Sequence, residues 1–236
     1  MAPSDLPEVL AIDRAEIAVE PWQWEFAQER RAEIERHFTR RRLTQPELWN
    51  GRLLMLNRCA VHDSTLQGSG FETDYASFLA WRDWDFPDAG VFNVFAAAAL
   101  RSADGAYLVG VMAPTTASPG QVYFPCGTPD RDDVTADDAL DLGGSVAREL
   151  LEETGLDFGE LEAQPGWTLV RDRGFLALMK RLTASESAER LRARILGHLA
   201  REPQPEFSDI HIVRGRDDLD QAMPPFLVAY LERVWR

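Results

Sequence analysis

Hydrophobic and polar positions alternate in recognisable ways along the first 90 residues of the chain. Short runs of branched residues with period-two alternation indicate strands, and apolar residues spaced three and four apart indicate helices. The expected elements are strands at 10–19 and 53–61 and helices at 21–42 and 74–81. Between the second strand and the second helix, Gly68-Ser69-Gly70 favours a plain loop, since paired glycines usually interrupt regular structure.

From about residue 90 the pattern changes to a meander of strands, followed by strands that alternate with helices. The predicted strands are 91–100, 107–112, 121–124, 167–171, 175–182 and 210–213, and the predicted helices are 185–200, 224–235 and one that ends before Gly155. This order predicts an α/β (α+β) fold with a mixed β-sheet sandwiched between helices. It also predicts two parts, an N-terminal strand and helix extension over 1–90 and a body over 91–236.

Composition and charge narrow the class of protein. The chain has 236 residues, of which 45% are hydrophobic, so a sizeable core is expected. The net charge of −14 argues against nucleic-acid polymers and anionic membranes as partners. A small phosphorylated substrate stays compatible, because arginines and metal ions can reverse the field inside a site. With no secretory signal and no bilayer-length apolar segment, we expect a cytoplasmic protein, and its two cysteines are expected to be reduced.

Three glutamates carry the clearest chemical signal in the sequence. Glu149, Glu152 and Glu153 are spaced at i, i+3 and i+4, which places them on one face of a helix. Like charges on one face repel each other unless something positive lies over them. A hard divalent cation such as Mg²⁺ is the natural counter-charge, because it prefers carboxylate oxygens and keeps water and phosphate oxygens as its other ligands.

The alternative is a purely structural, solvated acidic helix face that binds nothing. Val146 and Leu150 give the helix apolar neighbours, so we expect it to dock onto the body, and Gly155 is suited to end it in the left-handed conformation. The glutamate spacing alone leaves both interpretations open.

The run Arg148-Glu149-Leu150-Leu151-Glu152-Glu153-Thr154-Gly155-Leu156 resembles the second half of the signature of the Nudix hydrolases. The preceding Phe124-Pro125-Cys126-Gly127 resembles the strand end and glycine turn that usually come before it. The resemblance implies a Nudix-type fold and an enzyme that hydrolyses phosphoric anhydrides with Mg²⁺, for which Mn²⁺ could substitute. It further implies that Glu149, Glu152 and Glu153 bind the metal and that Arg148 orients Glu149.

The first half of the signature departs from the family pattern. Its usual spacing puts Leu140 where an upstream glutamate is expected, so the loop after Gly127 looks expanded. Three aspartates of this loop could supply the missing acid: Asp137, Asp138 and Asp141. The last of them could equally be the N-cap of the helix.

A further acid from outside the helix is often recruited by such hydrolases. Glu206 is the candidate, because it precedes the predicted strand at 210–213, and an ordinary surface acid is the alternative. Glu152 or Glu153 could accept the proton of the attacking water, with Glu206 as an alternative base.

A looser likeness in order and scattered identities, over about 48–236, resembles the UDP-sugar pyrophosphatase branch of the family. It implies cleavage of the diphosphate of a nucleoside diphosphate that is linked to another moiety, such as a UDP-sugar. Asn57, His62 and Asp74 are then candidates for substrate binding, with structural roles as the alternative. Trp81 and Trp84 could stack a base, although a position in the core or at its rim is favoured.

Two other functions stay open. One is a Nudix-fold module that binds a nucleotide for regulation without turnover. The other is a hydrolase of a different diphosphate, such as coenzyme A, ADP-ribose or a dinucleoside polyphosphate. Related hydrolases often form dimers, so the resemblance also implies a homodimer as one assembly state.

Overall fold

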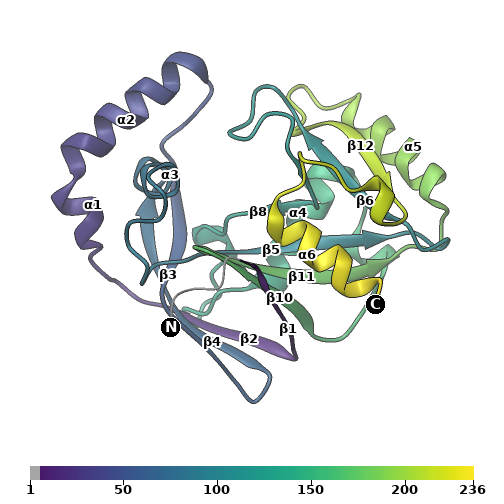
Figure 1. Cartoon of the computed structure of the whole chain (residues 1–236), viewed down its shortest axis with the longest axis horizontal. Helices are drawn as coiled ribbons and strands as arrows, with labels where there is room; N and C mark the ends of the chain where they lie inside the picture. Colours follow the sequence, from purple (N-terminus) through teal and green to yellow (C-terminus); the bar gives the residue numbers. More distant parts are fainter. Residues whose placement is uncertain (1–5) are drawn as a thin grey trace.

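The computed structural model describes residues 6–236 and contains two β-sheets, the larger of which has nine strands (Figure 1). Its main strands run in the order β1-β10-β11-β5-β6-β12, and the pairing of β11 with β5 is parallel whereas the other pairings are antiparallel. Its strands are β1 (Glu8–Ile12), β5 (Asn93–Arg101), β6 (Tyr107–Met112), β7 (Val122–Tyr123), β8 (Cys126–Gly127), β9 (Glu162–Ala163), β10 (Trp167–Asp172), β11 (Phe175–Thr183) and β12 (Phe207–Val213).

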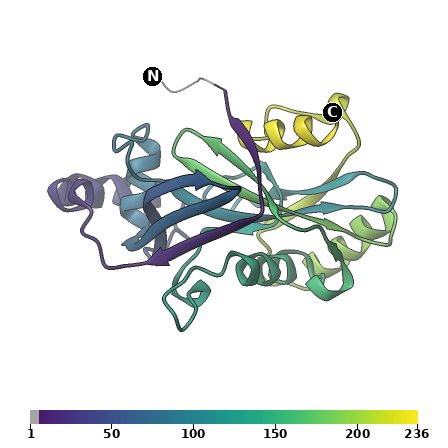
Figure 2. The same ribbon diagram turned by 90° about the horizontal axis from the view of Figure 1, so that it is seen from below.

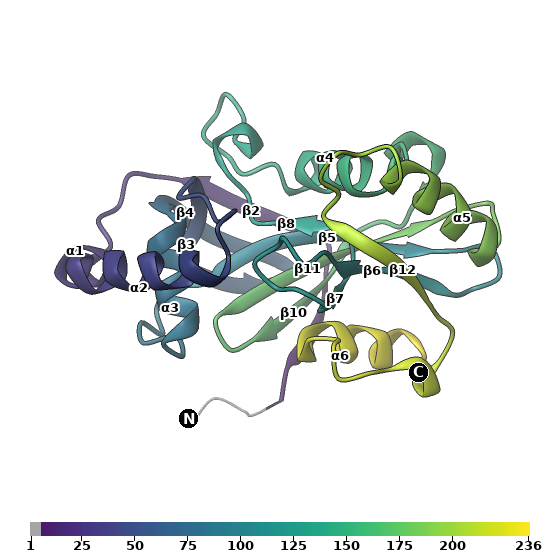
Figure 3. The same ribbon diagram turned by 90° about the horizontal axis from the view of Figure 1, so that it is seen from above.

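Helices cover both faces of this sheet, as Figure 3 shows, with α4 (Leu142–Thr154) and α5 (Ala188–Leu199) on one side and α6 (Pro225–Val234) on the other. The central strand β5 explains this arrangement, because successive side chains of a strand point to opposite faces. Val94 and Ala96 join the core beneath α4 and α5, whereas Phe95 and Ala97 join the core beneath α6. A strand that is apolar on both faces needs cover on both. The predicted mixed sheet between helices is therefore confirmed.

The smaller sheet has the strand order β2-β4-β3 and carries the N-terminal helices on its outer side (Figures 1 and 2). Its strands are β2 (Arg14–Val19), β3 (Arg52–His62) and β4 (Thr65–Asp74), and the helices are α1 (Glu25–Glu29), α2 (Arg31–Thr44) and α3 (Tyr75–Asp83). Leu54 and Leu56 belong to the core shared with the large sheet, whereas Met55 and Phe71 belong to a separate core with the helices. Trp81 is fully buried in that separate core, as favoured from the sequence.

Two predicted N-terminal elements are each divided in the structure. The expected strand at 10–19 becomes β1 and β2, which lie in different sheets, and the expected helix at 21–42 becomes α1 and α2, separated at Arg30. Because β1 pairs with β10, the N-terminal extension contributes a strand to the sheet of the body. The domain division near residue 90 stays a prediction.

The prediction of a loop at Gly68-Ser69-Gly70 is wrong, because these residues lie within β4 between β2 and β3. A Cβ atom at Gly68 would lie 3.1 Å from the carbonyl oxygen of Arg58 and 3.3 Å from side-chain atoms of Ile17. Glycine therefore serves close approach of neighbouring strands here, which local sequence pattern does not reveal.

Other expectations concern the cysteines and the helices. Cys59 and Cys126 are free thiols, as predicted. Within residues 6–236, no helix combines the length and apolar character needed to cross a membrane. Short 3-10 turns are present in the loops: η1 (Arg131–Asp133), η2 (Phe158–Glu160) and η3 (Arg216–Asp218).

Candidate active site

Helix α4 is fixed at both ends and along one side. Asp141 caps its N-terminus, where its Oδ1 accepts a hydrogen bond of 2.9 Å from the N–H of Gly144, and Gly155 ends it with a φ of 69°. Val146 and Leu150 are fully buried beneath it. The predicted docking, the glycine end and the N-cap alternative for Asp141 are confirmed, so the helix holds its glutamates against the body.

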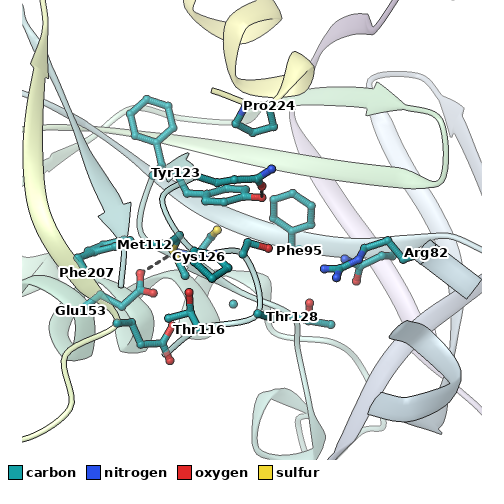
Figure 4. A pocket seen from close by; sticks show the side chains of 18 of the residues that line it. Arg82, Phe95, Met112, Thr116, Tyr123, Cys126, Thr128, Glu153, Phe207 and Pro224 are labelled. Carbon is teal, nitrogen blue, oxygen red and sulfur yellow. Dashed lines mark hydrogen bonds between the residues drawn. The ribbon is translucent and has the colours of Figure 1, made fainter. Parts of the chain in front are cut away.

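Glu153 and Glu149 lie beneath the short strand β8. Glu153 is 5% exposed, and its Oε2 accepts a hydrogen bond of 2.9 Å from the backbone N–H of Cys126, drawn as a dashed line in Figure 4. A Cβ atom at Gly127 would lie only 2.1 Å from Oε1 of Glu149. The glycine before the expanded loop thus leaves room for a carboxylate of the helix.

Glu206 brings a third carboxylate to this place. It directly precedes β12, as predicted, and its backbone carbonyl accepts a hydrogen bond of 2.7 Å from the N–H of Ala113. Glu206 lines the same cavity as Glu153, and its side chain interacts electrostatically with both Glu149 and Glu153. We refer to Glu153 and Glu206, together with Glu149, which lies against the cavity-lining Gly127, as the acidic end of the cavity.

Crowding and burial shift the proton equilibria of these carboxylates. Burial raises the pKa of Glu153 well above its usual value, and the nearby Glu206 and Glu149 raise it further. Burial also raises the pKa of Glu149 to about 7, against the opposing effect of Arg148. The acidic end therefore carries more potential negative charge than the neighbouring side chains neutralise, as expected of a cation site.

Arg148 is the neighbouring cation, and it is held by an acid that sequence reasoning missed. Its Nη2 donates hydrogen bonds of 3.0 Å to both carboxylate oxygens of Asp133, while its Nη1 donates to Glu149 at 2.9 Å and to Glu152 at 3.3 Å. The side chain of Asp133 is only 3% exposed. The implied contact of Arg148 with Glu149 is present. The bidentate ion pair with Asp133 fixes the orientation of the Arg148 guanidinium.

A local signal for Asp133 exists in the sequence. Asp130 and Asp133 form a reciprocal capping box around the turn η1, a pattern of two acids three residues apart. The strict signature spacing directs attention to Asp137, Asp138 and Asp141 instead, of which the last caps α4 and the second has a left-handed backbone with a φ of 54°. Because the loop is expanded, the acid of this loop that contacts Arg148 is Asp133, which lies upstream of the three aspartates that the signature spacing indicates.

The remaining candidates lie elsewhere. The side chain of Glu152 is 58% exposed and faces Arg148 rather than the cavity. Asp74 caps α3 through the N–H of Ser77 and forms an ion pair of 2.8 Å with Arg31. Asn57 lies within β3 and His62 at its exposed end. None of these four side chains lines the cavity.

The cavity itself has a volume of about 940 Å³, which suits a ligand of nucleotide size. Glu153 and Glu206 line one end, and Cys126 and Thr128 lie beside them. Figure 4 shows Glu153 and Arg82 on opposite sides, with Phe95 and Tyr123 between them. A long ligand could therefore place one group at the carboxylates and another some distance away.

The donor set of the acidic end fits a hard divalent cation. Within the part of the chain that the structure describes, no group of three or more His, Cys, Asp or Glu side chains is placed so that it could hold a metal ion by itself. Mg²⁺ is usually bound through one or two carboxylates, with water and substrate phosphate oxygens completing its shell. Coordination by one or two of the carboxylates of Glu149, Glu153 and Glu206, with water and phosphate oxygens as the other ligands, would match this preference.

No known family and no curated protein match the chain by sequence. Among solved structures, it is similar to RenU, a Nudix hydrolase from M. smegmatis, with 17% identity over 61% of this chain and 86% of that chain and a TM-score of 0.41. It is also similar to a Nudix hydrolase from Nitrosomonas europaea, with 16% identity over 61% and 88% and a TM-score of 0.39. A MutT protein from Methanosarcina mazei Go1 has 15% identity over 60% and 91% and a TM-score of 0.35. At this level of similarity the chemistry has to follow from the residues of the site alone.

Proposed function

We propose that this chain is a Nudix hydrolase, a metal-dependent pyrophosphohydrolase that cleaves the diphosphate of a nucleoside diphosphate linked to another moiety. The observation that carries the proposal is the crowding of Glu149, Glu153 and Glu206, of which Glu153 and Glu206 line one end of a cavity of about 940 Å³. The resemblance of residues 148–156 to the Nudix signature supports it. A UDP-sugar is the specific substrate that the looser sequence resemblance favours.

Mg²⁺ is the cofactor in this proposal, and Mn²⁺ could replace it. Glu149, Glu153 and Glu206 would hold the metal, while the exposed Glu152 would act at the rim. When bound, the metal supplies positive charge against the diphosphate oxygens and lowers the pKa of the water that is consumed. Asp133 holds Arg148, Arg148 orients Glu149, and the N–H of Cys126 orients Glu153.

The reaction consumes one water molecule for each anhydride bond cut. The water oxygen bonds to one phosphorus, the bond from that phosphorus to the bridging oxygen breaks, and the bridging oxygen leaves with the other phosphate. The water proton passes to a carboxylate, for which Glu153 and Glu206 are the favoured bases, because both line the cavity. Glu152 stays the alternative base that the signature implies.

A substrate screen tests this function. Purified protein is incubated with UDP-sugars, ADP-ribose, coenzyme A and dinucleoside polyphosphates, with Mg²⁺, with Mn²⁺ or with EDTA, and the products are identified by mass. We expect two phosphate-bearing products from at least one substrate, formed only with metal. The panel also separates the UDP-sugar proposal from the other diphosphates.

A regulatory module without turnover is the second candidate, and one observation favours it. Leu140 stands at the position of the upstream glutamate, and Asp133 of the same loop forms an ion pair with Arg148 instead. Titration with Mn²⁺ separates the two functions. Metal binding without product from any substrate would favour the module.

A further inference from the structure

Four aromatic rings that the proposed reaction does not use line the cavity, and two of them, Phe95 and Tyr123, lie between Glu153 and Arg82 in Figure 4. Phe226 of α6 lies 5.3 Å from Phe95, 6.0 Å from Tyr123 and 6.3 Å from Phe175, measured between ring centroids. All four rings line the cavity, and we call them the aromatic end. Such a set offers flat, polarisable walls that favour a planar ligand group.

Strand register places two polar side chains beside these rings. Phe175 is paired with Asp172 of β10 on one side and with Asn93 of β5 on the other. Side chains of directly paired residues project from the same face of a sheet. A carboxyl, a phenyl ring and an amide therefore form one row on the face that α6 covers, and all three line the cavity.

The amide of this row has an unmet hydrogen-bonding need. Asn93 is 4% exposed, and its Oδ1 accepts no hydrogen bond from any residue in 6–236. A buried acceptor without a donor destabilises the fold, and a donor on a ligand would remove that cost. Asp172 accepts a hydrogen bond from the backbone N–H of Phe226, and its second oxygen and remaining lone pairs can still accept others.

The polar groups decide between a planar base and a sugar. A nucleobase presents flat faces for the rings and N–H groups at its edge for Asn93 and Asp172. A hexose presents hydroxyl groups all around its rim, whereas this row offers only Asn93 and Asp172 as partners, and hydroxyls buried without a partner are costly. Arg82 of α3, whose guanidinium lies 5.8 Å from the ring of Phe78, borders the same end with a positive charge.

We propose that the aromatic end is a base-recognition subsite, in which Phe175 and its neighbouring rings hold a nucleobase and Asn93 and Asp172 accept hydrogen bonds from its N–H groups. This inference rests on the proposed function, since it assigns the nucleoside part of the substrate to one end of the cavity and the diphosphate to the other. No single segment of the sequence contains this subsite, because its residues come from separate strands and helices.

Binding of nucleoside monophosphates tests the subsite without any hydrolysis. AMP, GMP, CMP, UMP and ribose 5-phosphate lack the anhydride bond, so calorimetric titration of each measures binding alone. We expect at least one nucleotide to bind more tightly than ribose 5-phosphate by about tenfold or more, because stacking of a base on an aromatic ring contributes about 1–3 kcal/mol. Equal affinity for all five compounds would overturn the subsite.

Two substitutions test separately the stacking on the aromatic rings and the hydrogen bonds to the edge of the base. Phe175→Leu keeps apolar volume but removes the ring, and it should reduce the preference over ribose 5-phosphate by about tenfold. Phe158→Leu, in the turn η2 and outside the cavity, is the matched control and should leave the preference unchanged. Asp172→Asn replaces an acceptor with a group that also donates, so it should change the order of the four nucleotides.

The outcomes distinguish the two proposals. A protein that prefers nucleotides in this assay but hydrolyses no diphosphate contradicts the proposed function and leaves the subsite standing. A protein that hydrolyses diphosphates, yet binds nucleotides and ribose 5-phosphate equally, contradicts the subsite alone. Thermal melts of each variant confirm that it is folded, and the Asp172→Asn ranking decides the matter if Phe175→Leu does not fold. If Asp172→Asn leaves the ranking of the four nucleotides by affinity unchanged, Asp172 does not accept a hydrogen bond from the base, and that assignment is overturned.

Discussion

The acidic end and the aromatic end of the cavity differ in how they are built and in what each lacks. The acidic end gathers Glu149 and Glu153 from one helix with Glu206 from a neighbouring loop, and its nearest cation, Arg148, is held by Asp133. Negative charge is therefore in excess. The aromatic end gathers rings from several strands and α6 and leaves an amide acceptor unpaired. The acidic end needs a cation, and the aromatic end needs a planar ligand group that donates hydrogen bonds. The two ends therefore have separate roles, which substitutions can test one at a time.

The largest expected effect is at the acidic end. Glu153→Gln should lower kcat by roughly 10²–10⁴-fold, because the amide cannot take up a proton as a carboxylate can. The fold should be kept, since the amide oxygen can still accept the hydrogen bond from Cys126. Steady-state kinetics on the best substrate measures the change, with the exposed Glu162→Gln as the matched control. Wild-type turnover in Glu153→Gln, or loss of nucleotide preference in that variant, would break the division between the ends.

Asp133→Asn should have the next largest effect, although Asp133 does not line the cavity. An amide binds the Arg148 guanidinium more weakly than the bidentate carboxylate of Asp133 does, so Arg148 no longer fixes the orientation of Glu149. Partners that orient metal ligands in this way typically contribute roughly 10–100-fold in metal affinity or activity. Mn²⁺ titration measures the affinity, and Asp133→Glu should restore part of it. If Asp133→Asn binds Mn²⁺ as tightly as the wild type does, Asp133 has only a structural role in its loop.

Glu152→Gln should lower turnover by only about tenfold, within the range for a partner at the rim of a metal site. Its side chain is 58% exposed and contacts Arg148, whereas Glu153 is buried in the cavity wall. Kinetics of the two glutamine variants side by side measures the difference. A loss equal to that of Glu153→Gln would assign the two glutamates equal roles, as the signature alone implies.

The smallest effect is a dependence of stability on pH in the metal-free protein. The pKa of Glu149 rises from 4.5 to about 7 on folding, chiefly through burial. The folded state holds this proton more tightly, so its stabilising contribution is complete below about pH 4.5 and is lost as the pH rises through about 7. Melting temperatures in EDTA should therefore fall between about pH 5 and 8, and Glu149→Gln should flatten the slope.

Added Mn²⁺ should reverse this trend, because the metal competes with protons for the same carboxylates and binds better as they ionise. Thermal melts with and without Mn²⁺ across the same window measure the reversal. A melting temperature in EDTA that does not fall over this window would be inconsistent with a buried, crowded Glu149.

The acidic end could be predicted from the sequence because its chemistry lies within one helix. Helix periodicity puts Glu149 and Glu153 on one face whatever the rest of the fold does, whereas Glu206 was expected from the resemblance to the Nudix family. Asp133 could not be found by spacing, since an expanded loop breaks the register of the signature. Here the distance along the chain no longer reports the distance in space.

The aromatic end could not be predicted, for a different reason. The row of Asp172, Phe175 and Asn93 exists only through the pairing of three strands, and a shift of one residue in register would turn these side chains to the other face. The strand through Gly68 and Gly70 was missed on similar grounds, because its glycines serve contacts with neighbouring strands. Chain pattern predicted the layers of the fold well, whereas pairing between distant segments decided the rest.

Hydrolysis in ¹⁸O-labelled water tests the central claim most directly. The substrate that gives products in the screen is incubated with Mg²⁺ in labelled water, and the masses of both products are measured by mass spectrometry. Attack of water on phosphorus at the acidic end predicts a single ¹⁸O atom in a phosphate group of one product, formed only when metal is present. Label on carbon, or the same labelled product in EDTA, would contradict the assignment of Glu149, Glu153 and Glu206 to metal-dependent cleavage of a diphosphate.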